Sequence, residues 1–425
     1  MRRARTWQLP LWLVLAVALS QCGGGGGGTP ASSAAQGNTI AGTTGGTVGQ
    51  PLTPATPGSV QLKLTELITN LSSPWGLAFL PDRRMLITER GGTLRLRQAD
   101  GSVPAGGDSV SGVPAVLVAG QGGLLDVAVD PDFASNRRIY LSYSEGTASA
   151  NGTAVARAVL DPDARALGSV TVIFQQLPKV ASTAHFGSRL VFDREGRLVV
   201  TLGERLLDTQ RGFAQDLGRD NGKVMRITTD GAPAPGNPLA PVANTHQDSI
   251  WSYGHRNPQG AALNPSTGEL WVSEHGPQGG DEINRIVAGH NYGWPVISYG
   301  QEYGTTTQVG EGTAKAGMDQ PATYWEKIDG SAWTGGAKSS IAPSGLAFYS
   351  ADAIPQWKGN LFVGALAGTA LWRLTLDGNA VTGRERLLAD RGERIRDVRQ
   401  GPDGWLYLLT DASPNGKLLR FEAQQ

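Results

Sequence analysis

The sequence predicts an all-β protein, a six-bladed β-propeller built from four-stranded antiparallel blades. Three observations support this fold class. The chain has 59 Gly and 25 Pro among 425 residues, a composition that favours tight turns over long helices. From about Val60 onward, short apolar runs follow one another without helical periodicity. A hairpin-like unit also recurs six times at intervals of roughly 64 residues, which is room for four strands and their loops.

Each repeated unit contains an apolar run, a turn rich in Gly, Pro, Asp or Asn, and a second apolar run that often ends at an acidic residue. The six units span residues 76–89, 123–143, 190–204, 260–274, 345–365 and 397–411. An up-and-down barrel would need shorter and more even spacing, so a ring of six blades is the favoured closure.

The segment before the repeats predicts export. Residues 1–22 contain a basic start and an apolar run over 9–19 that is too short to span a bilayer. The run ends at Leu19-Ser20-Gln21-Cys22, which resembles a bacterial lipobox, although Gln21 stands where a small residue is usual. An ordinary cleaved secretory signal is the alternative. We predict a periplasmic or outer-envelope protein, with lipidation at Cys22 as its one link to a membrane.

Domain organisation follows from a change in composition. Residues 23–58 are rich in Gly, Ser, Thr and Pro and predict a flexible tether. Residues 59–425 are expected to form the propeller catalytic domain. Cys22 is the single cysteine, so no intramolecular disulfide is possible.

The charge balance excludes some partners. The chain has 37 Lys and Arg against 37 Asp and Glu, a formal net charge of zero. Nucleic acids and anionic membrane surfaces require a basic excess, so neither is expected as the main partner. The sequence contains no zinc-ligand spacing, phosphate loop or nucleophile elbow, and its Gly-x-Gly-x-x-Gly match lies within the tether, where no strand precedes it.

Antiparallel connectivity predicts where a functional site lies. The start of the first strand and the end of the second strand in every hairpin meet at one edge, and loops on such an edge commonly carry binding residues. The leading loops contribute Gln121, His185, Arg256, Asn257, Pro343, Ser344, Arg394 and Arg396, and the trailing ends contribute Glu89, Glu204, Glu274, His275, Gly276, Pro277 and Asp411.

Some of these residues have distinct chemistry. His185 has the pKa range of a general base, although a lone histidine is often structural. Arg394 and Arg396 alternate along an extended segment and so point to one side. Such a pair can bind carboxylates bidentately, or form ordinary surface ion pairs. The glycine-rich loop 274–282 could turn carbonyls towards calcium, although it lacks EF-hand spacing.

Several segments together resemble the soluble quinoprotein glucose and aldose sugar dehydrogenases, which use pyrroloquinoline quinone (PQQ). The matching segments are 74–77, 120–125, 185–190, 254–260, 274–284, 291–295 and 394–398, in family order from about Leu64 to the C-terminus. The pattern is closer to the aldose branch. The resemblance implies oxidation of an aldose at its anomeric carbon to a lactone, with electrons passed through PQQ to an external acceptor.

The resemblance also implies roles for individual residues. His185 would take the proton from the anomeric hydroxyl, and Glu204 would orient it. Calcium would bind the carbonyls of Gly276 and Pro277. Arg256 and Asn257 would hold the quinone end of PQQ, and Arg394 and Arg396 would bind its carboxylates. Gln121 and Asp281 would line the substrate pocket.

Two positions depart from the family pattern. Ala367 stands where the family has a cofactor-binding lysine, and we hypothesise that Lys338 could replace it. Glu204 stands where an aspartate is expected. The departure at Ala367 leaves open a non-catalytic propeller that binds sugar or protein. The other alternative is a calcium-dependent, lactonase-like propeller, because such enzymes also hold a metal at the central tunnel. The sequence does not specify the sugar, the electron acceptor or the oligomeric state.

Overall fold

The structure, a computed structural model, describes residues 62–423. The predicted signal segment 1–22 with Cys22, and the predicted tether 23–58, lie outside the described residues and stay predictions. Within 62–423, no helix combines the length and the apolar character needed to cross a membrane.

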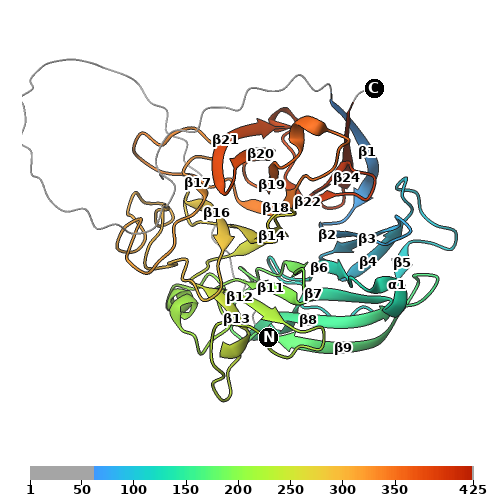
Figure 1. Cartoon of the computed structure of the whole chain (residues 1–425), viewed down its shortest axis with the longest axis horizontal. Helices are drawn as coiled ribbons and strands as arrows, with labels where there is room; N and C mark the ends of the chain where they lie inside the picture. The colour runs from blue at the N-terminus through green and yellow to red at the C-terminus, as the bar shows by residue number, and fades with distance from the viewer. Residues whose placement is uncertain (1–61, 424–425) are drawn as a thin grey trace, which may run out of the picture. The chain divides into compact units, whose positions relative to one another are not determined.

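Residues 62–423 form six four-stranded antiparallel sheets arranged around a common centre, so the predicted propeller is confirmed (Figure 1). The innermost strands β2, β6, β10, β14, β18 and β22 contact one another in sequence, and β22 contacts β2 to close the ring. The second strand in most blades is buried at every position. This burial on both faces explains why the sequence shows continuous apolar runs instead of alternation.

The strands of the first three blades are as follows. Blade one contains β2 (Pro74–Phe79), β3 (Met85–Glu89), β4 (Thr93–Arg97) and β5 (Ser109–Val110). Blade two contains β6 (Leu124–Val129), β7 (Arg138–Thr147), β8 (Ala150–Leu160) and β9 (Leu167–Gln175). Blade three contains β10 (Leu190–Phe192), β11 (Leu198–Leu202), β12 (Lys223–Ile227) and β13 (Ile250–Tyr253).

The other blades follow the same plan. Blade four contains β14 (Pro258–Leu263), β15 (Leu270–Glu274), β16 (Asp281–Ile286) and β17 (Thr323–Trp325). Blade five contains β18 (Pro343–Phe348), β19 (Leu361–Ala365), β20 (Ala370–Asp377) and β21 (Ala380–Leu387). Blade six contains β22 (Ile395–Gln400), β23 (Leu406–Thr410), β24 (Gly416–Ala423) and β1 (Leu62–Leu71). The helical segments described are short, namely α1 (Phe133–Asn136) and the 3-10 turns Asp208–Gln215, Gln247–Ser249, Pro355–Trp357 and Ala389–Arg391.

Blade six combines strands from the two ends of the described chain. Strand β1 pairs antiparallel with β24, from Leu62 opposite Ala423 to Leu71 opposite Gly416. The six hairpin repeats do not predict this pairing, because β1 lies before the first hairpin and its partner follows the last one. With β1 added, blade six has four strands like the other five blades, and the ring is complete.

Buried hydroxyl groups join each of the first five blades to the next. A Ser or Thr side chain of one blade donates a hydrogen bond to a carbonyl at the start of the next inner strand or just before it. The donor–acceptor pairs are Thr88 to Leu125, Ser142 to Ser188, Thr201 to Pro258, Ser273 to Ser344 and Ser344 to Ile395. Because a buried hydroxyl requires a partner, these bonds fix the relative position of the inner strands, and with them the loops.

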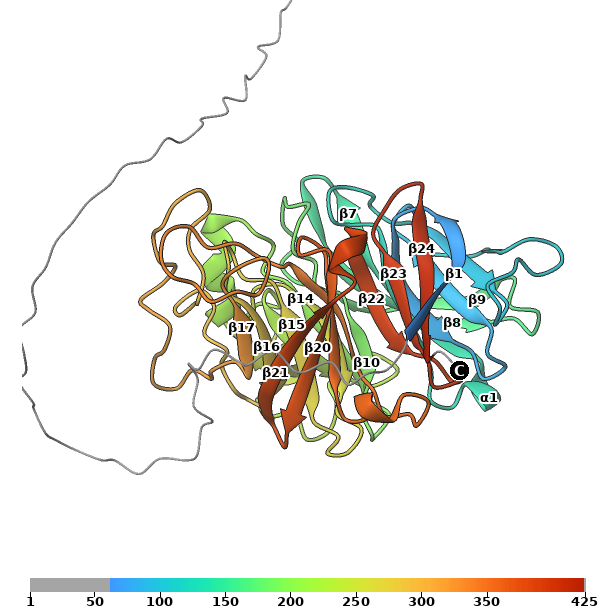
Figure 2. The same cartoon turned by 90° about the horizontal axis from the view of Figure 1, so that it is seen from above.

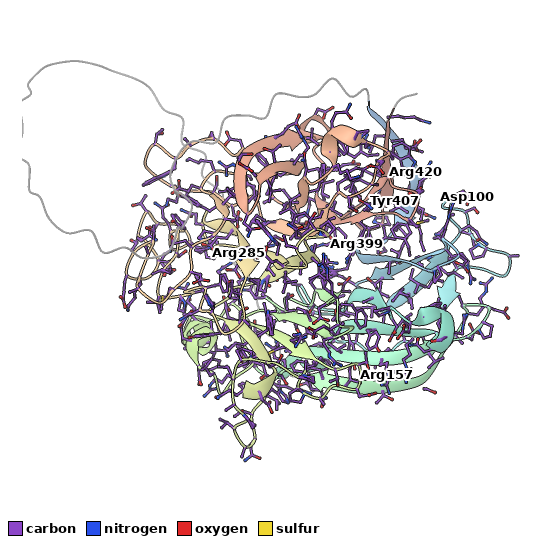
Figure 3. All side chains as sticks on the ribbon, in the orientation of Figure 1. Asp100, Arg157, Arg285, Arg399, Tyr407 and Arg420 are labelled. Atoms are coloured by element: carbon purple, nitrogen blue, oxygen red, sulfur yellow. The ribbon has the colours of Figure 1, made fainter. Side chains whose placement is uncertain are left out.

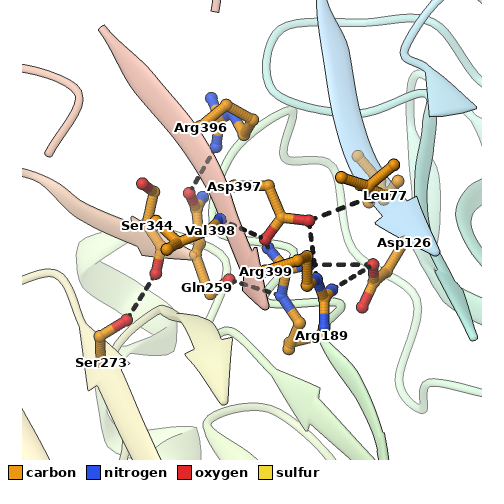
Figure 4. A network of polar contacts seen from close by, with 12 residues as sticks. Leu77, Asp126, Arg189, Gln259, Ser273, Ser344, Arg396, Asp397, Val398 and Arg399 are labelled. Carbon is orange, nitrogen blue, oxygen red and sulfur yellow. Dashed lines mark hydrogen bonds and ion pairs between the residues drawn. The ribbon is translucent and has the colours of Figure 1, made fainter. Parts of the chain in front are cut away.

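An ion network at the centre of the ring joins blades two, three and six (Figure 4). Arg189 lies 2.9 Å from Asp126 and 3.2 Å from Asp397. Arg399 contacts the same two carboxylates at 3.1 and 3.0 Å. Figure 3 places Arg399 near the middle of the ring, whereas Arg157 and Arg420 lie towards its outer edge. Each buried charge is paired, which is the condition for tolerating it in the interior.

Candidate active site

The predicted site residues do gather at one end of the ring. Figure 2 shows the sheets from the side, with the connecting loops at their two ends. Contacts join the predicted residues into two groups. The first runs from Gln121 through His185 and Glu204 to Arg256 and the Gly276 loop, and the second contains Arg394, Arg396 and Asp411.

His185 and Glu204 form a buried pair. The distance from His185 Nδ1 to Glu204 Oε1 is 3.0 Å, and the two side chains are 4% and 1% exposed. Glu204 also accepts a hydrogen bond from the backbone N–H of Leu206, while His185 donates its own N–H to Gln121 Oε1 at 2.9 Å. His185 has a φ of 49°, a left-handed conformation that is costly for a non-glycine residue and that often occurs at functional sites.

The surroundings keep His185 neutral. Burial, reinforced by the positive charge of Arg256, lowers the pKa of His185 to about 4, although the bond to Glu204 opposes the shift. The neutral imidazole therefore donates its Nδ1–H to Glu204. Its Nε2 then carries the lone pair and makes no hydrogen bond to the residues that the structure describes. This is the state that a general base requires.

Arg205 holds the loop that carries His185. It is completely buried, with its guanidinium 3.8 Å from the centre of the Phe186 ring. It donates hydrogen bonds to the carbonyls of Ser182 and Ala184 at 2.6 and 2.9 Å, and to Asn151. Because Arg205 follows Glu204 directly, one dipeptide fixes both the imidazole and its backbone. The sequence analysis did not assign this role.

Arg256 and Asn257 each have a buried N–H group that donates no hydrogen bond to the described residues. Arg256 donates to the carbonyl of Gly276 at 2.5 Å and to the hydroxyl of Tyr303 at 2.9 Å, and its Nε lies 3.9 Å from Glu204. Asn257 accepts a hydrogen bond from Gly187. Within the described residues, Arg256 Nε and Asn257 Nδ2 are buried without a hydrogen-bond partner. Unpaired buried donors are costly, so these two are free for a ligand.

Arg394 and Arg396 do converge, as their alternation predicts. Both donate to the same oxygen of Asp411, each at 3.1 Å. Arg396 is buried and also contacts Gln259 at 2.8 Å, whereas the Arg394 side chain is 46% exposed. Two guanidinium groups that share one carboxylate oxygen retain donors for a further anion.

Asp281 fixes the glycine-rich loop after β15 by accepting hydrogen bonds from the backbone and from a neighbouring loop. This carboxylate is fully buried and accepts hydrogen bonds from Gly276 N, Ser340 Oγ and Ile341 N at 2.9, 2.8 and 2.6 Å. Burial raises the pKa of Asp281 to about 6. A side chain at Gly276 would place its Cβ 2.3 Å from the Gly279 carbonyl, so the loop requires glycine there. These contacts orient the Gly276 loop; the contact of Asp281 with substrate stays a prediction.

Lys338 does not have a free ammonium group in this structure. Its Nζ lies 2.7 Å from Glu326 and 2.6 Å from the carbonyl of Tyr299, and the residue is 6% exposed. Ala367 is exposed on the loop after β19. The hypothesis that Lys338 replaces a cation at Ala367 therefore has no support from the geometry.

Sequence analysis missed Arg90 and Tyr303, in addition to Arg205. Arg90 follows Glu89 at the end of the first hairpin, as Arg205 follows Glu204 and His275 follows Glu274. The recurrence of a polar residue after the glutamate that ends the hairpin could have identified Arg90 and Arg205 from the sequence. Tyr303 lies in the long connection between β16 and β17, where no repeat could have identified it.

Propeller and site together define the class of protein. Residues 71–420 match the family model described as Glucose / Sorbosone dehydrogenase, and the chain belongs to that family. The protein is therefore an enzyme, an oxidoreductase of the sugar dehydrogenase type, and the resemblance predicted from the sequence is confirmed.

Individual relatives show which members of the family the chain is similar to. Aldose sugar dehydrogenase YliI of Escherichia coli (strain K12) is 46% identical over 369 residues, covering 86% of this chain and 94% of that protein. The crystal structure of the soluble aldose sugar dehydrogenase from Escherichia coli in its apo form superposes with a TM-score of 0.77, at 45% identity, over 86% of this chain and 100% of that one. The PQQ-bound aldose sugar dehydrogenase from Streptomyces coelicolor gives a TM-score of 0.69 at 30% identity, over 87% and 100% of the two chains.

Proposed function

We propose that this enzyme is a PQQ- and calcium-dependent aldose dehydrogenase. It oxidises an aldose at the anomeric carbon to a lactone and passes the electrons to an external acceptor. The observation that carries the proposal is the neutral, glutamate-bound His185 beside buried donors that lack partners. A similar protein has been solved with PQQ bound.

The residues present fit PQQ. The cofactor is a flat ortho-quinone with three carboxylates, so it needs hydrogen-bond donors at one end and cations at the other. Arg256 Nε and Asn257 Nδ2 are unpaired buried donors, and they would hold the quinone oxygens. Arg394 and Arg396, with spare donors, would bind the carboxylates.

His185 would start the reaction as general base. Bound PQQ supplies a two-electron acceptor for the hydride that leaves the anomeric carbon. His185 Nε2 takes the proton of the anomeric hydroxyl, so that the C–H and O–H bonds of the sugar become the C=O of the lactone. Glu204 holds Nδ1–H and stabilises the imidazolium that forms. Arg205 keeps the base in position.

Calcium would bind through backbone carbonyls. The Gly276 carbonyl is directed at the Arg256 side chain, and so towards the site. Among the described residues, no group of three or more His, Cys, Asp or Glu side chains is placed to hold a metal. We therefore propose that Gly276 and Pro277 supply carbonyl ligands and that the cofactor supplies others, with calcium acting as a Lewis acid.

The test uses the full chain, purified free of cofactor. PQQ and calcium are added, and aldose-dependent reduction of an artificial electron-acceptor dye is followed, with glucose first and other aldoses after it. We expect reduction that needs both additions and is lost in His185→Ala. Absence of reduction together with absence of PQQ absorbance would reject the proposal. Lactone hydrolysis that needs calcium alone would then favour a lactonase-like propeller, and sugar binding without turnover a binding propeller.

We further propose that the chain is exported and anchored by a lipid on Cys22, as residues 1–22 predict. In cells fed a labelled fatty acid, the native chain should incorporate label and partition with membranes. Cys22→Ser should lose both properties. Export of an unlabelled native chain would instead favour an ordinary cleaved signal.

A further inference from the structure

Arg90 occupies a position in blade one that other blades use for the site. In three blades, the residue that pairs with the start of the inner strand is followed directly by a polar side chain on the loop face. The three pairs are Pro74 with Glu89, Pro258 with Glu274 and Ile395 with Thr410. The residues that follow are Arg90, His275 and Asp411. The fold therefore places Arg90 at the same level as Asp411, which contacts Arg394 and Arg396, and as His275, whose carbonyl accepts a hydrogen bond from Arg256 at 3.2 Å.

The contacts of Arg90 place it between the two groups of site residues. Its Nη1 donates to the carbonyl of Gly120 at 2.8 Å, next to Gln121, which holds His185. Its Nη2 lies 3.5 Å from Ser73 Oγ. The backbone N–H of Ser73 in turn donates to the carbonyl of Ala412 at 2.7 Å, next to Asp411. Arg90 thus lies beside the Arg394–Arg396 pair, on its blade-one side.

Arg90 differs from its neighbours in making no direct ion pair with a carboxylate, although its charge contributes to lowering the pKa of Asp411. Arg394 and Arg396 share Asp411, and Arg256 lies near Glu204. Across residues 62–423, no ion pair joins Arg90 to a carboxylate, and its buried Nε has no hydrogen-bond partner. Burial lowers the pKa of Arg396, and the charge of Arg90 lowers it further. Three cations therefore surround the single carboxylate of Asp411, and this excess of positive charge is unfavourable unless a ligand brings negative charge.

We infer that Arg90 binds a carboxylate of the quinone cofactor, as a third guanidinium beside Arg394 and Arg396. This inference rests on the proposed function. Two guanidinium groups and Asp411 leave one net positive charge facing a tricarboxylate, and Arg90 raises it to two. On the other side of the pair, the loop 366–369 has no cationic side chain of its own, and Arg386 of β21 donates to the carbonyl of Gly368 at 2.7 Å.

The experiment measures PQQ binding by the full chain without turnover. Cofactor-free protein is titrated with PQQ in the presence of calcium, and the quenching of tryptophan fluorescence is followed. For Arg90→Gln we expect Kd to rise roughly tenfold or more, since a charge-assisted hydrogen bond is lost. The dependence of Kd on salt should also become weaker. Arg90→Lys keeps the charge and should stay within about threefold of the native Kd.

Arg83→Gln is the matched control. Arg83 lies exposed in the turn at the far end of β3, on the same blade but at the opposite face, and its loss should leave Kd unchanged. Native affinity in Arg90→Gln would overturn the inference and leave the proposed function intact. A loss in Arg90→Lys as large as in Arg90→Gln would also overturn it, because packing would then explain the effect. Failure of the native chain to bind PQQ would reject the proposed function itself.

Discussion

Glu204 divides its two carboxylate oxygens between His185 and its own loop. Oε1 lies 3.0 Å from His185 Nδ1, and Oε2 accepts the backbone N–H of Leu206. Both contacts require an oxygen acceptor. The carboxylate therefore fixes the imidazole tautomer and the backbone at the end of blade three at the same time.

Replacing Glu204 by Gln should remove the negative charge while keeping the size of the side chain. An amide can offer an oxygen to His185 or to Leu206, but its NH₂ group then faces the other donor. We expect kcat to fall roughly 10²-fold, because the tautomer and the imidazolium lose support. Glu204→Asp keeps the charge and should lose less. Steady-state kinetics at saturating sugar make the measurement, with Glu311→Gln, an exposed residue, as control. Equal kcat in native enzyme and Glu204→Gln would contradict this role.

The pH dependence of activity should report the lowered pKa of His185. Burial lowers this pKa to about 4, so the base is already neutral at pH 5 and above. We expect kcat/KM of the PQQ-loaded enzyme to change little between pH 7 and pH 5, and to fall only as the pH approaches 4. An ordinary histidine would lose activity around pH 6.5. Measuring kcat/KM from pH 4 to pH 8 distinguishes a lowered pKa from an ordinary one. A midpoint of the activity loss near pH 6.5 would contradict the prediction.

The same shift has a consequence for stability. The pKa of His185 is lower in the folded state than in the unfolded state, so between about pH 6.5 and 4 the unfolded chain binds more protons. The contribution of His185 to stability must therefore decrease as the pH falls through this window. Urea unfolding at pH 7 and pH 5 should show a smaller decrease for His185→Gln than for the native chain. An identical decrease in the two proteins would show that other groups cause it.

Arg205→Lys should damage both the fold and the reaction. Lysine cannot reach the carbonyls of Ser182, Ala184 and Asn151 together, so buried acceptors lose their partners. We expect a loss of about 2–4 kcal/mol in the free energy of unfolding, and at least a tenfold fall in kcat at a temperature where the variant is folded. Arg219→Lys is the matched control, since Arg219 also lies over a phenylalanine ring, at 4.0 Å, but is partly exposed. A variant with lower stability and native kcat would limit Arg205 to a structural role.

The ion network at the centre of the ring should matter for stability. Arg189→Met would leave Asp126 and Asp397 with Arg399 as their shared cation. We expect a loss of about 3–5 kcal/mol in the free energy of unfolding, as for other buried ion pairs that lose one partner. Urea denaturation measures it, with Arg420→Met on the outer edge as control. A loss below about 1 kcal/mol would place the network among pairs of little net value.

The sequence predicted the parts of this molecule that repeat. The second strand of most blades is visible because complete burial makes it apolar. Hairpin connectivity alone brings Gln121, His185, Glu204, Arg256 and Arg396 to one end of the ring. Pairings across the chain were not predictable. Nothing local distinguishes β1 as part of blade six, and the ion pair between Lys338 and Glu326 depends on the fold of a long loop.

The pairing of β1 with β24 sets an order for assembly. Blade six cannot be completed until residues 416–423 have been synthesised, although β1 is made among the first residues of the propeller. Throughout synthesis of the other five blades, β1 is a strand edge without its partner, the kind of edge that associates with other chains. The ring therefore closes after translation of its last strand, and the nascent protein must keep its first strand available until then.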